Sequence, residues 1–361
     1  MMRGAQDRRR RSSGGWVRKS VLGMALALLL PFGASVAGVA GSANAAFDPT
    51  AMDFWVDSST GMGPIKSRIF RAADGNTDRV VYALDGMRAR DDISGWESDT
   101  DVARALTAAN INVVMPVGGM SSFYADWAAP STVLGIPAGT GSSSGSSSGS
   151  ASGSGELQMM SGGPGKSYRY TWETFLTKDL RNALSARLGF NPNRNGVFGL
   201  SMGGSAALTL AAYHPDQFSF AGSFSGYLNI SAPGMREAMR LAMADAGGFN
   251  VDSMALPWSP QWLRMDPFVF APRLKANNTR LWISAASAIP GPGDVTSVMS
   301  VIQGMPLEAL ALANTRAFQV RMAAIGANNV DYDFPASGVH NWANWAAEVY
   351  RMIPDLSSNI G

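Results

Sequence analysis

The stretch GVFGLSMGGSAALTLAAYHPDQF (196–218) decides the fold. Its first five residues form an apolar run typical of a short strand, and the alanine-rich residues 202–214 are typical of a helix. Between them lies a G-x-S-x-G motif at 199–203, whose glycines remove side chains that would collide in a sharp strand-to-helix turn. Such a turn exposes the serine oxygen. The motif therefore predicts Ser201 as a nucleophile, with a plain helix-capping serine as the alternative.

A serine nucleophile needs a general base, and the chain contains only two histidines. His214 lies at the far end of the helix that Ser201 begins, where about twelve residues at ~1.5 Å each put it roughly 18 Å away. His340 lies in the loop after the last predicted strand, where α/β-hydrolases carry their histidine. We therefore predict His340 as the base and His214 as a helix-terminal residue. The backbone N–H of Met202, at the start of the helix, is predicted to stabilise an oxyanion.

The acid that orients the histidine is left open by chain order. Asp294 follows the apolar segment RLWISAA (280–286), in the loop where a generic hydrolase carries its acid. Glu308 begins the next predicted helix and fits equally well. The residue pattern thus predicts a serine–histidine–acid triad with two candidates for its third member.

Strand and helix patterns alternate along the chain. The predicted strands are residues 67–70, 79–84, 111–115, 196–200, 280–286 and 330–334, and residues 217–225 approach another. The predicted helices are residues 101–109, 171–188, 202–214, 307–325 and 343–353. Because strands such as VVYAL (80–84) are apolar throughout, we predict a central, mostly parallel sheet with helices on both faces. With the serine in a strand-to-helix turn, this arrangement favours an α/β-hydrolase fold.

The first 45 residues have the order of a secretory signal peptide. The segment begins with seven basic residues between positions 3 and 19, which are followed by an apolar run (21–30). It ends with small residues, the last three of which are ANA (43–45). Pro31 and Gly33 interrupt the apolar run well short of the ~20 residues that span a bilayer. We therefore predict that residues 1–45 are cleaved and that the protein is secreted; an uncleaved anchor is the alternative.

Cleavage would change the charge of the chain. It removes 7 of 29 basic and 1 of 27 acidic residues, leaving 22 against 26, so the mature chain is acidic overall. A basic surface for nucleic acid is therefore not expected. With no cysteine and only two histidines, the chain also lacks the usual ligands of zinc and iron–sulfur centres, and we expect no metal and no cofactor.

Residues 139–155, GTGSSSGSSSGSASGSG, are a low-complexity Gly/Ser tract. The tract has almost no side chains to bury, so it predicts a flexible surface insertion at about 139–165. Strands before the insertion need strands after it as partners. Residues 46–361 are therefore predicted to form one catalytic domain.

Six segments together resemble the antigen 85 family of mycolyltransferases. They are LDGMRARDDISGW (84–96), MPVGGMSSFYADW (115–127), YTWETFLTKDL (170–180), GLSMGGSAALTLAAYHPDQF (199–218), ANNTRLWIS (276–284) and FPASGVHNWANW (334–345). The similarity covers nearly the whole mature chain, in order. It implies an α/β-hydrolase fold, secretion to the cell envelope, and transfer of mycolyl groups between trehalose monomycolates, giving trehalose dimycolate, or onto arabinogalactan.

The resemblance also implies roles for particular residues. The family carries its triad glutamate in a segment like LEALALANTRAF (307–318), so Glu308 becomes the expected acid and Asp294 the weaker choice. The backbone N–H of Met87 would be the second oxyanion donor beside that of Met202. By the same resemblance, the residues expected to line the trehalose site are Asp85, Arg88 and Trp342.

The chain departs from the family pattern at three points. The Gly/Ser tract has no counterpart in it, Ala285 stands where family members often have a cysteine, and Asp99 stands where they have a sugar-contacting asparagine. These departures bear on the acceptor rather than on the triad. The expected activity is acyl transfer through a serine acyl-enzyme, with trehalose mycolates as partners. The alternatives are a secreted carboxylesterase with the same triad and a non-catalytic protein that binds the envelope or host matrix.

Overall fold

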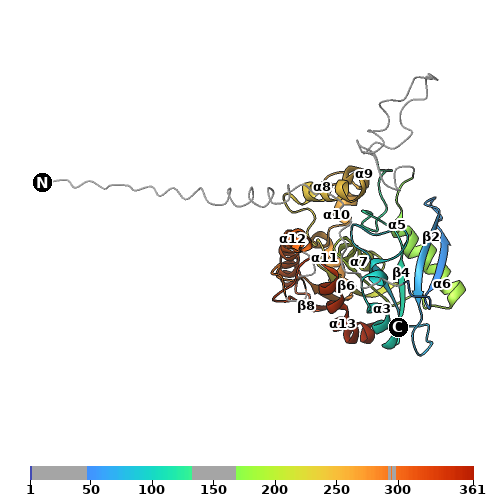
Figure 1. Cartoon of the computed structure of the whole chain (residues 1–361). Coiled ribbons are helices and arrows are strands. Elements are labelled where there is room, and N and C mark those ends of the chain that lie inside the picture. Colours follow the sequence, from blue (N-terminus) through green and yellow to red (C-terminus); the bar gives the residue numbers. More distant parts are fainter. Residues whose placement is uncertain (2–46, 132–167, 292–293, 295–297) are drawn as a thin grey trace, which may run out of the picture. The chain divides into compact units, whose positions relative to one another are not determined.

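The computed structural model describes Met1 and residues 47–131, 168–291, 294 and 298–361 (Figure 1). The predicted signal peptide (1–45) and almost all of the chain around the Gly/Ser tract, including the predicted insertion at 139–165, lie outside the described residues. Both therefore stay predictions. Among the described residues, no helix is long and apolar enough to cross a membrane.

A single eight-stranded sheet forms the centre of the described chain, in the order β1-β2-β4-β3-β5-β6-β7-β8. All neighbours from β4 to β8 are parallel, whereas β1 and β2 are antiparallel at one edge. The strands are β1 (Met52–Asp57), β2 (Pro64–Phe70), β3 (Val80–Leu84), β4 (Asn112–Pro116), β5 (Asn195–Leu200), β6 (Phe218–Phe224), β7 (Arg280–Ser284) and β8 (Val330–Asp333). This mostly parallel sheet confirms the predicted α/β-hydrolase fold.

Two hydrophobic cores lie on opposite faces of the sheet. Along β3, the side chains of Tyr82 and Leu84 enter one core, and those of Val81 and Ala83 enter the other, as the two-residue period of a strand requires. The first core is covered by α6 (Leu180–Leu188), α7 (Met202–Tyr213), α11 (Pro267–Ala276) and α12 (Val298–Ala324). The second is covered by α2 (Gly95–Ser98), α3 (Val102–Ala108) and α13 (Trp342–Asn359). Helices therefore cover both faces, as predicted.

Several elements differ from the prediction in extent. Helix α12 begins at Val298 rather than at residue 307, because it continues through Pro306, a residue type that usually ends or kinks a helix. Helix α13 likewise runs past Pro354 to Asn359. The helix predicted at 171–188 is three consecutive pieces, with the π-helix η2 (Phe175–Asp179) between α5 (Trp172–Thr174) and α6. The edge strand β1 was not predicted.

The connection from β6 to β7 contains a cluster of helices that the sequence analysis does not predict. These helices are α8 (Met235–Gly247), α9 (Val251–Met254), α10 (Pro260–Arg264) and the longer α11. Asp245 of α8 forms an ion pair with Arg88, which follows the carboxyl end of β3. This ion pair holds helix α8 beside the carboxyl end of β3. We call α8, α9 and α10 together the cap (Figure 1).

Candidate active site

Ser201 lies in the sharp turn between β5 and α7, with φ 51° and ψ −119°. A positive φ is uncommon for a residue with a side chain, and such strain is typical of functional sites. The motif glycines permit the turn: a Cβ on Gly199 would lie 2.5 Å from the carbonyl of Gly203, and a Cβ on Gly203 would lie 2.4 Å from the carbonyl oxygen of Asp85. The turn therefore has the geometry that the motif predicts.

The two predicted oxyanion donors follow the ends of neighbouring strands. Leu84 at the end of β3 pairs with Gly199 of β5, and Met87 follows it, while Met202 is the first residue of α7. Between Leu84 and Met87, a Cβ on Gly86 would lie 3.7 Å from the Ser201 Cβ. Neither the Met87 nor the Met202 N–H donates a hydrogen bond to another described residue. Both are therefore available to a ligand beside Ser201.

Glu308 and His340 are brought into contact by α12 and the loop after β8. The His340 Nδ1 lies 2.9 Å from Glu308 Oε2. The other carboxylate oxygen, Oε1, accepts hydrogen bonds from the Ser225 hydroxyl at 2.9 Å and the Ala286 N–H at 2.6 Å. Glu308 is fully buried, so these donors replace the water that a carboxylate would otherwise bind. Its orientation is thus fixed from both sides.

Asp294, the rival acid, is engaged elsewhere. Its two oxygens accept hydrogen bonds from Asn341 Nδ2 at 2.7 Å and from the Gly291 N–H at 2.7 Å. It therefore supports the loop that carries His340 without contacting the imidazole. Of the two acids that chain order left open, the structure pairs Glu308 with the histidine.

Tyr227 lies between Ser201 and His340, and no sequence pattern predicted it. Its ring stacks on the His340 ring with centroids 6.4 Å apart and planes 19° apart. Burial raises the pKa of its hydroxyl to about 12, although a hydrogen bond with Ser201 opposes that rise. No hydrogen bond joins Ser201 directly to His340 among the described residues, and such catalytic bonds often form only when substrate binds. A shared neighbour nevertheless puts both side chains in one site.

Ser225 and Trp345 are further site residues that sequence reasoning missed. Ser225 follows β6 with φ 51°, and its hydroxyl, which donates to Glu308, accepts the Trp345 indole N–H at 3.0 Å. The Trp345 ring also meets the His340 ring edge-on, with centroids 4.9 Å apart. No local motif marks either residue, because their roles depend on strands and helices that meet only in the folded chain.

The three predicted sugar-site residues are partly brought together. Asp85 is buried, and its carboxylate accepts the Gly95 N–H at 3.1 Å, while Trp342 packs so closely on Gly95 that an added Cβ would lie 2.3 Å from the indole. Burial raises the pKa of Asp85 to about 7, against the effect of hydrogen bonds from Gly95, Ser94 and Trp96. Arg88 instead points to Asp245 on the cap.

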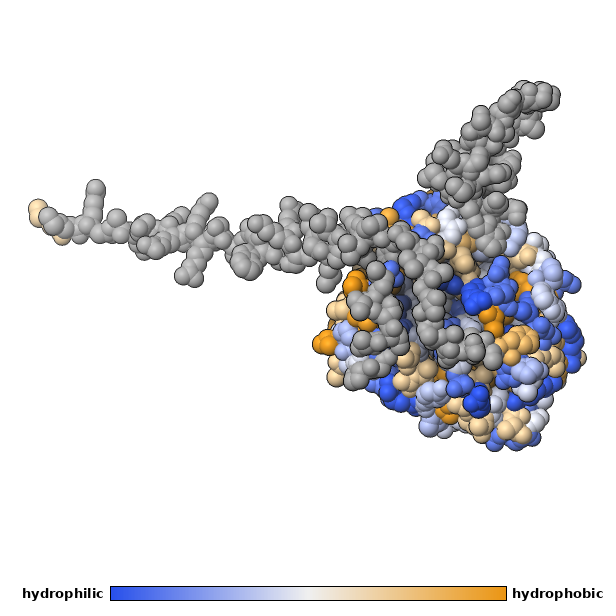
Figure 2. Space-filling model, in the orientation of Figure 1, coloured by the Kyte–Doolittle hydropathy of each residue, from blue (hydrophilic) through white to orange (hydrophobic). Residues whose placement is uncertain are grey.

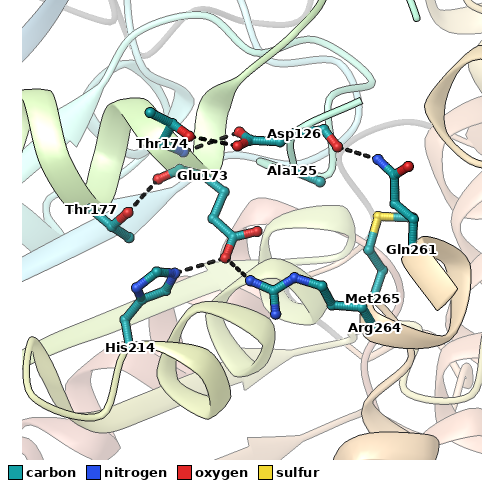
Figure 3. A pocket seen from close by; sticks show the side chains of 9 residues that line it. All are labelled: Ala125, Asp126, Glu173, Thr174, Thr177, His214, Gln261, Arg264 and Met265. Atoms are coloured by element: carbon teal, nitrogen blue, oxygen red, sulfur yellow. Dashed lines mark hydrogen bonds and ion pairs between the residues drawn. The ribbon is translucent and has the colours of Figure 1, made fainter. Parts of the chain in front are cut away.

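His214 lies at the opposite end of α7 in a separate polar cavity of about 290 Å³ (Figure 3). Its Nε2 lies 2.7 Å from Glu173 Oε1, and the same oxygen binds the Arg264 guanidinium. Asp126 lines the same cavity, where its carboxylate accepts from the Thr174 hydroxyl at 2.6 Å. The two hydroxyls that line this cavity both donate elsewhere, that of Thr174 to the Asp126 carboxylate and that of Thr177 to the Glu173 carbonyl oxygen. Among the described residues, neither hydroxyl is hydrogen-bonded to His214.

A protein-family model and a solved structure both relate the chain to esterases and hydrolases. The family model "Putative esterase" matches residues 129–356. An S-formylglutathione hydrolase from Agrobacterium tumefaciens has the same fold at 14% identity, with a TM-score of 0.56 over 86% of this chain and 96% of that one. The fold and the serine turn therefore define an esterase-type α/β-hydrolase.

Curated relatives identify the family more narrowly. The chain is 36% identical to diacylglycerol acyltransferase/mycolyltransferase Ag85B of Mycolicibacterium smegmatis, over 96% of this chain and 98% of that protein. It is 38% identical to the Ag85C protein of Mycobacterium avium, over 78% and 71% of the two chains. The crystal structure of Mycobacterium tuberculosis MPT51 (FbpC1) matches with a TM-score of 0.67 and 29% identity, over 86% of this chain and 99% of that one. The chain belongs to the antigen 85 diacylglycerol acyltransferase/mycolyltransferase family.

Proposed function

We propose that the protein is a secreted acyltransferase that moves mycolyl groups between trehalose monomycolates through an acyl-enzyme on Ser201. The observation that carries the proposal is the site itself: a strained serine, two unused backbone N–H donors, and a histidine bonded to a buried glutamate. The relatives of this chain are named diacylglycerol acyltransferase/mycolyltransferases, which supports a mycolyl group as the acyl group. Arabinogalactan hydroxyls are the second acceptor in this proposal, and the cell envelope is its location.

In the first half-reaction, His340 takes the proton of the Ser201 hydroxyl as the oxygen attacks the ester carbonyl of the donor. Glu308 stabilises the imidazolium that results, because Ser225 and Ala286 hold its other oxygen and so orient the carboxylate toward His340. The Met87 and Met202 N–H groups bind the oxyanion. The C–O bond to trehalose then breaks, and His340 returns the proton to the departing sugar oxygen.

In the second half-reaction, a sugar hydroxyl of the acceptor replaces trehalose. His340 takes its proton, the acceptor oxygen attacks the acyl carbonyl, and the bond to Ser201 breaks as the proton returns to Oγ. Asp85 and Trp342 support binding of the sugar, since a carboxyl group bonds hydroxyls and an indole packs on a pyranose ring. Arg88 would have to exchange Asp245 for a sugar hydroxyl to take part.

Lipid analysis tests the proposal. Mature protein is incubated with labelled trehalose monomycolate, with and without an added sugar acceptor. Without added acceptor, the expected product is trehalose dimycolate. With added acceptor, a labelled ester of that acceptor should also form. Ser201→Ala protein should give neither product. Free mycolate without any transfer product would show a carboxylesterase, and no product from folded wild-type protein would show a non-catalytic binding protein.

A further inference from the structure

The loop between α9 and α10 holds a tryptophan in an unusual backbone conformation. The Ser259 N–H donates to the Leu256 carbonyl at 3.2 Å, which closes a four-residue turn with Pro257 second and Trp258 third. Trp258 has φ 59°. A turn with proline second and positive φ third follows the type II pattern, whose third position favours glycine. Trp258, a residue with the largest type of side chain, thus occupies the turn position where a side chain is least favourable.

The same tryptophan is also strongly exposed. Trp258 is 66% exposed and Leu256 61% exposed, and Pro257 between them is exposed as well. On the face drawn in Figure 2, apolar residues are scattered among polar ones, and single exposed apolar residues of this kind are ordinary. Three consecutive exposed apolar residues at the tip of a turn are not. Both the strain and the exposure disfavour this tip in water, which points to a ligand outside the chain.

The structure on either side fixes the tip in place. The Ser259 hydroxyl accepts the Trp262 N–H at 3.2 Å and so caps α10. Arg236 of α8 donates to the Ala255 carbonyl at 2.8 Å, directly before the tip. The tip is therefore presented by anchored flanks, so little conformational entropy remains to be lost when it binds.

The charge around the tip selects the kind of ligand. Residues 255–261, ALPWSPQ, contain no charged side chain. The nearby cations Arg236 and Arg240 both pair with Asp252. An uncharged tip of leucine, proline and tryptophan can enter the headgroup layer of a lipid surface without stripping water from an ion, and tryptophan is the residue favoured at that depth.

We propose that Leu256-Pro257-Trp258 is an interfacial anchor that docks the cap onto a lipid surface. The anchor belongs to the same cap as α8, whose Asp245 holds Arg88 next to the oxyanion donor Met87. Docking here would hold the Ser201 site close to lipid-borne substrate. Only this role in bringing substrate to Ser201 rests on the proposed function. Lipid binding by the anchor does not depend on catalysis.

Sedimentation with vesicles tests the anchor. Full-length mature protein carrying Ser201→Ala is mixed with phosphatidylcholine vesicles, and its Trp258→Gly derivative is compared with it. Glycine relieves the turn, so Trp258→Gly should unfold at the same or a higher denaturant concentration, yet bind vesicles about tenfold or more weakly. Val320→Ser is the matched control, since Val320 on α12 is 69% exposed and lies in no such turn; it should bind as the parent does.

Other outcomes would overturn the anchor. Unchanged vesicle binding by Trp258→Gly would do so, as would binding seen only when phosphatidylglycerol is added, which would show an electrostatic contact. Light scattering that shows self-association lost in Trp258→Gly, with vesicle binding unchanged, would assign the tip to a second copy of the chain. If the protein with its native Ser201 gives no transfer product while vesicle binding still depends on Trp258, the proposed function is refuted and the anchor stands.

Discussion

The two ends of α7 each lie beside a histidine–glutamate pair, and the pairs differ in what surrounds them. At the Ser201 end, Glu308 is fully buried and His340 nearly so. At the other end, Glu173 and His214 are more exposed, and Arg264 shares the carboxylate. A histidine–carboxylate contact is thus not by itself a catalytic feature. What distinguishes the first pair is a strained serine, two N–H donors and a carboxylate with no competing cation among the described residues.

Replacing each histidine tests this contrast most strongly. His340→Gln should lower kcat/KM for acyl transfer by about 10⁴-fold or more, because it removes the base that we propose for Ser201. His214→Gln should leave kcat/KM unchanged. Steady-state rates on one ester substrate measure both variants. Equal losses for the two variants would mean that the surroundings of the pairs do not decide their function.

Replacing each glutamate is the next test. Glu308→Gln should lower kcat by about 10² to 10⁴-fold, since the amide no longer stabilises an imidazolium. Glu173→Gln should keep its kcat but lower the free energy of unfolding by about 1–3 kcal/mol, because Arg264 and His214 lose a charged partner. Rates and urea unfolding curves of both proteins give the comparison. A loss of kcat in Glu173→Gln would contradict it.

A third test contrasts Glu173, which has a cation beside it, with Asp85, whose hydrogen-bond donors are the Gly95 and Trp96 N–H groups and the Ser94 side chain. The pKa of Asp85 is raised to about 7 by burial, so the folded protein holds a proton that the unfolded chain loses near pH 4. The free energy of unfolding should therefore fall as pH rises from about 4 to about 7, by at most about 4 kcal/mol. Urea unfolding across this range should show the fall in wild type and a flatter profile in Asp85→Asn. Identical profiles would refute the assignment.

The smallest expected effect concerns the second donor to Glu308. Ser225→Ala removes one of the two hydrogen bonds to Oε1 and leaves that of Ala286, so kcat should fall about tenfold. Ser223→Ala is the control, because the buried Ser223 hydroxyl has no hydrogen-bond partner in the described structure. A larger loss in the control than in Ser225→Ala would show that packing on β6, not the orientation of Glu308, decides the rate.

The parts that could be predicted were those encoded by local pattern. β3 and β5 are buried on both faces, so their apolar runs marked them, and the glycines at 199 and 203 marked the turn. β1 was missed because it is an exposed edge strand with two buried residues, Phe54 and Val56. The helix start at Val298 was missed because Pro306 resembles a boundary.

Within the site, the residues that escaped prediction act across long stretches of chain. Ser225 meets Glu308 from 83 residues away and Trp345 from 120. The contact of Arg88 with Asp245 spans 157 residues. Such contacts depend on how the elements pack, and no periodicity or spacing near these residues encodes them. The choice between Asp294 and Glu308 could likewise not be made from the residues alone.

Detection of an acyl group on Ser201 would test the acyl-enzyme mechanism. Mature enzyme is mixed with a chromogenic acyl ester in the absence of sugar, quenched within the burst, and analysed by intact mass and peptide mapping. We expect one acyl group on the peptide that contains Ser201, released as a trehalose ester when trehalose is added. An adduct on another residue, or turnover by Ser201→Ala protein at the wild-type rate, would contradict it.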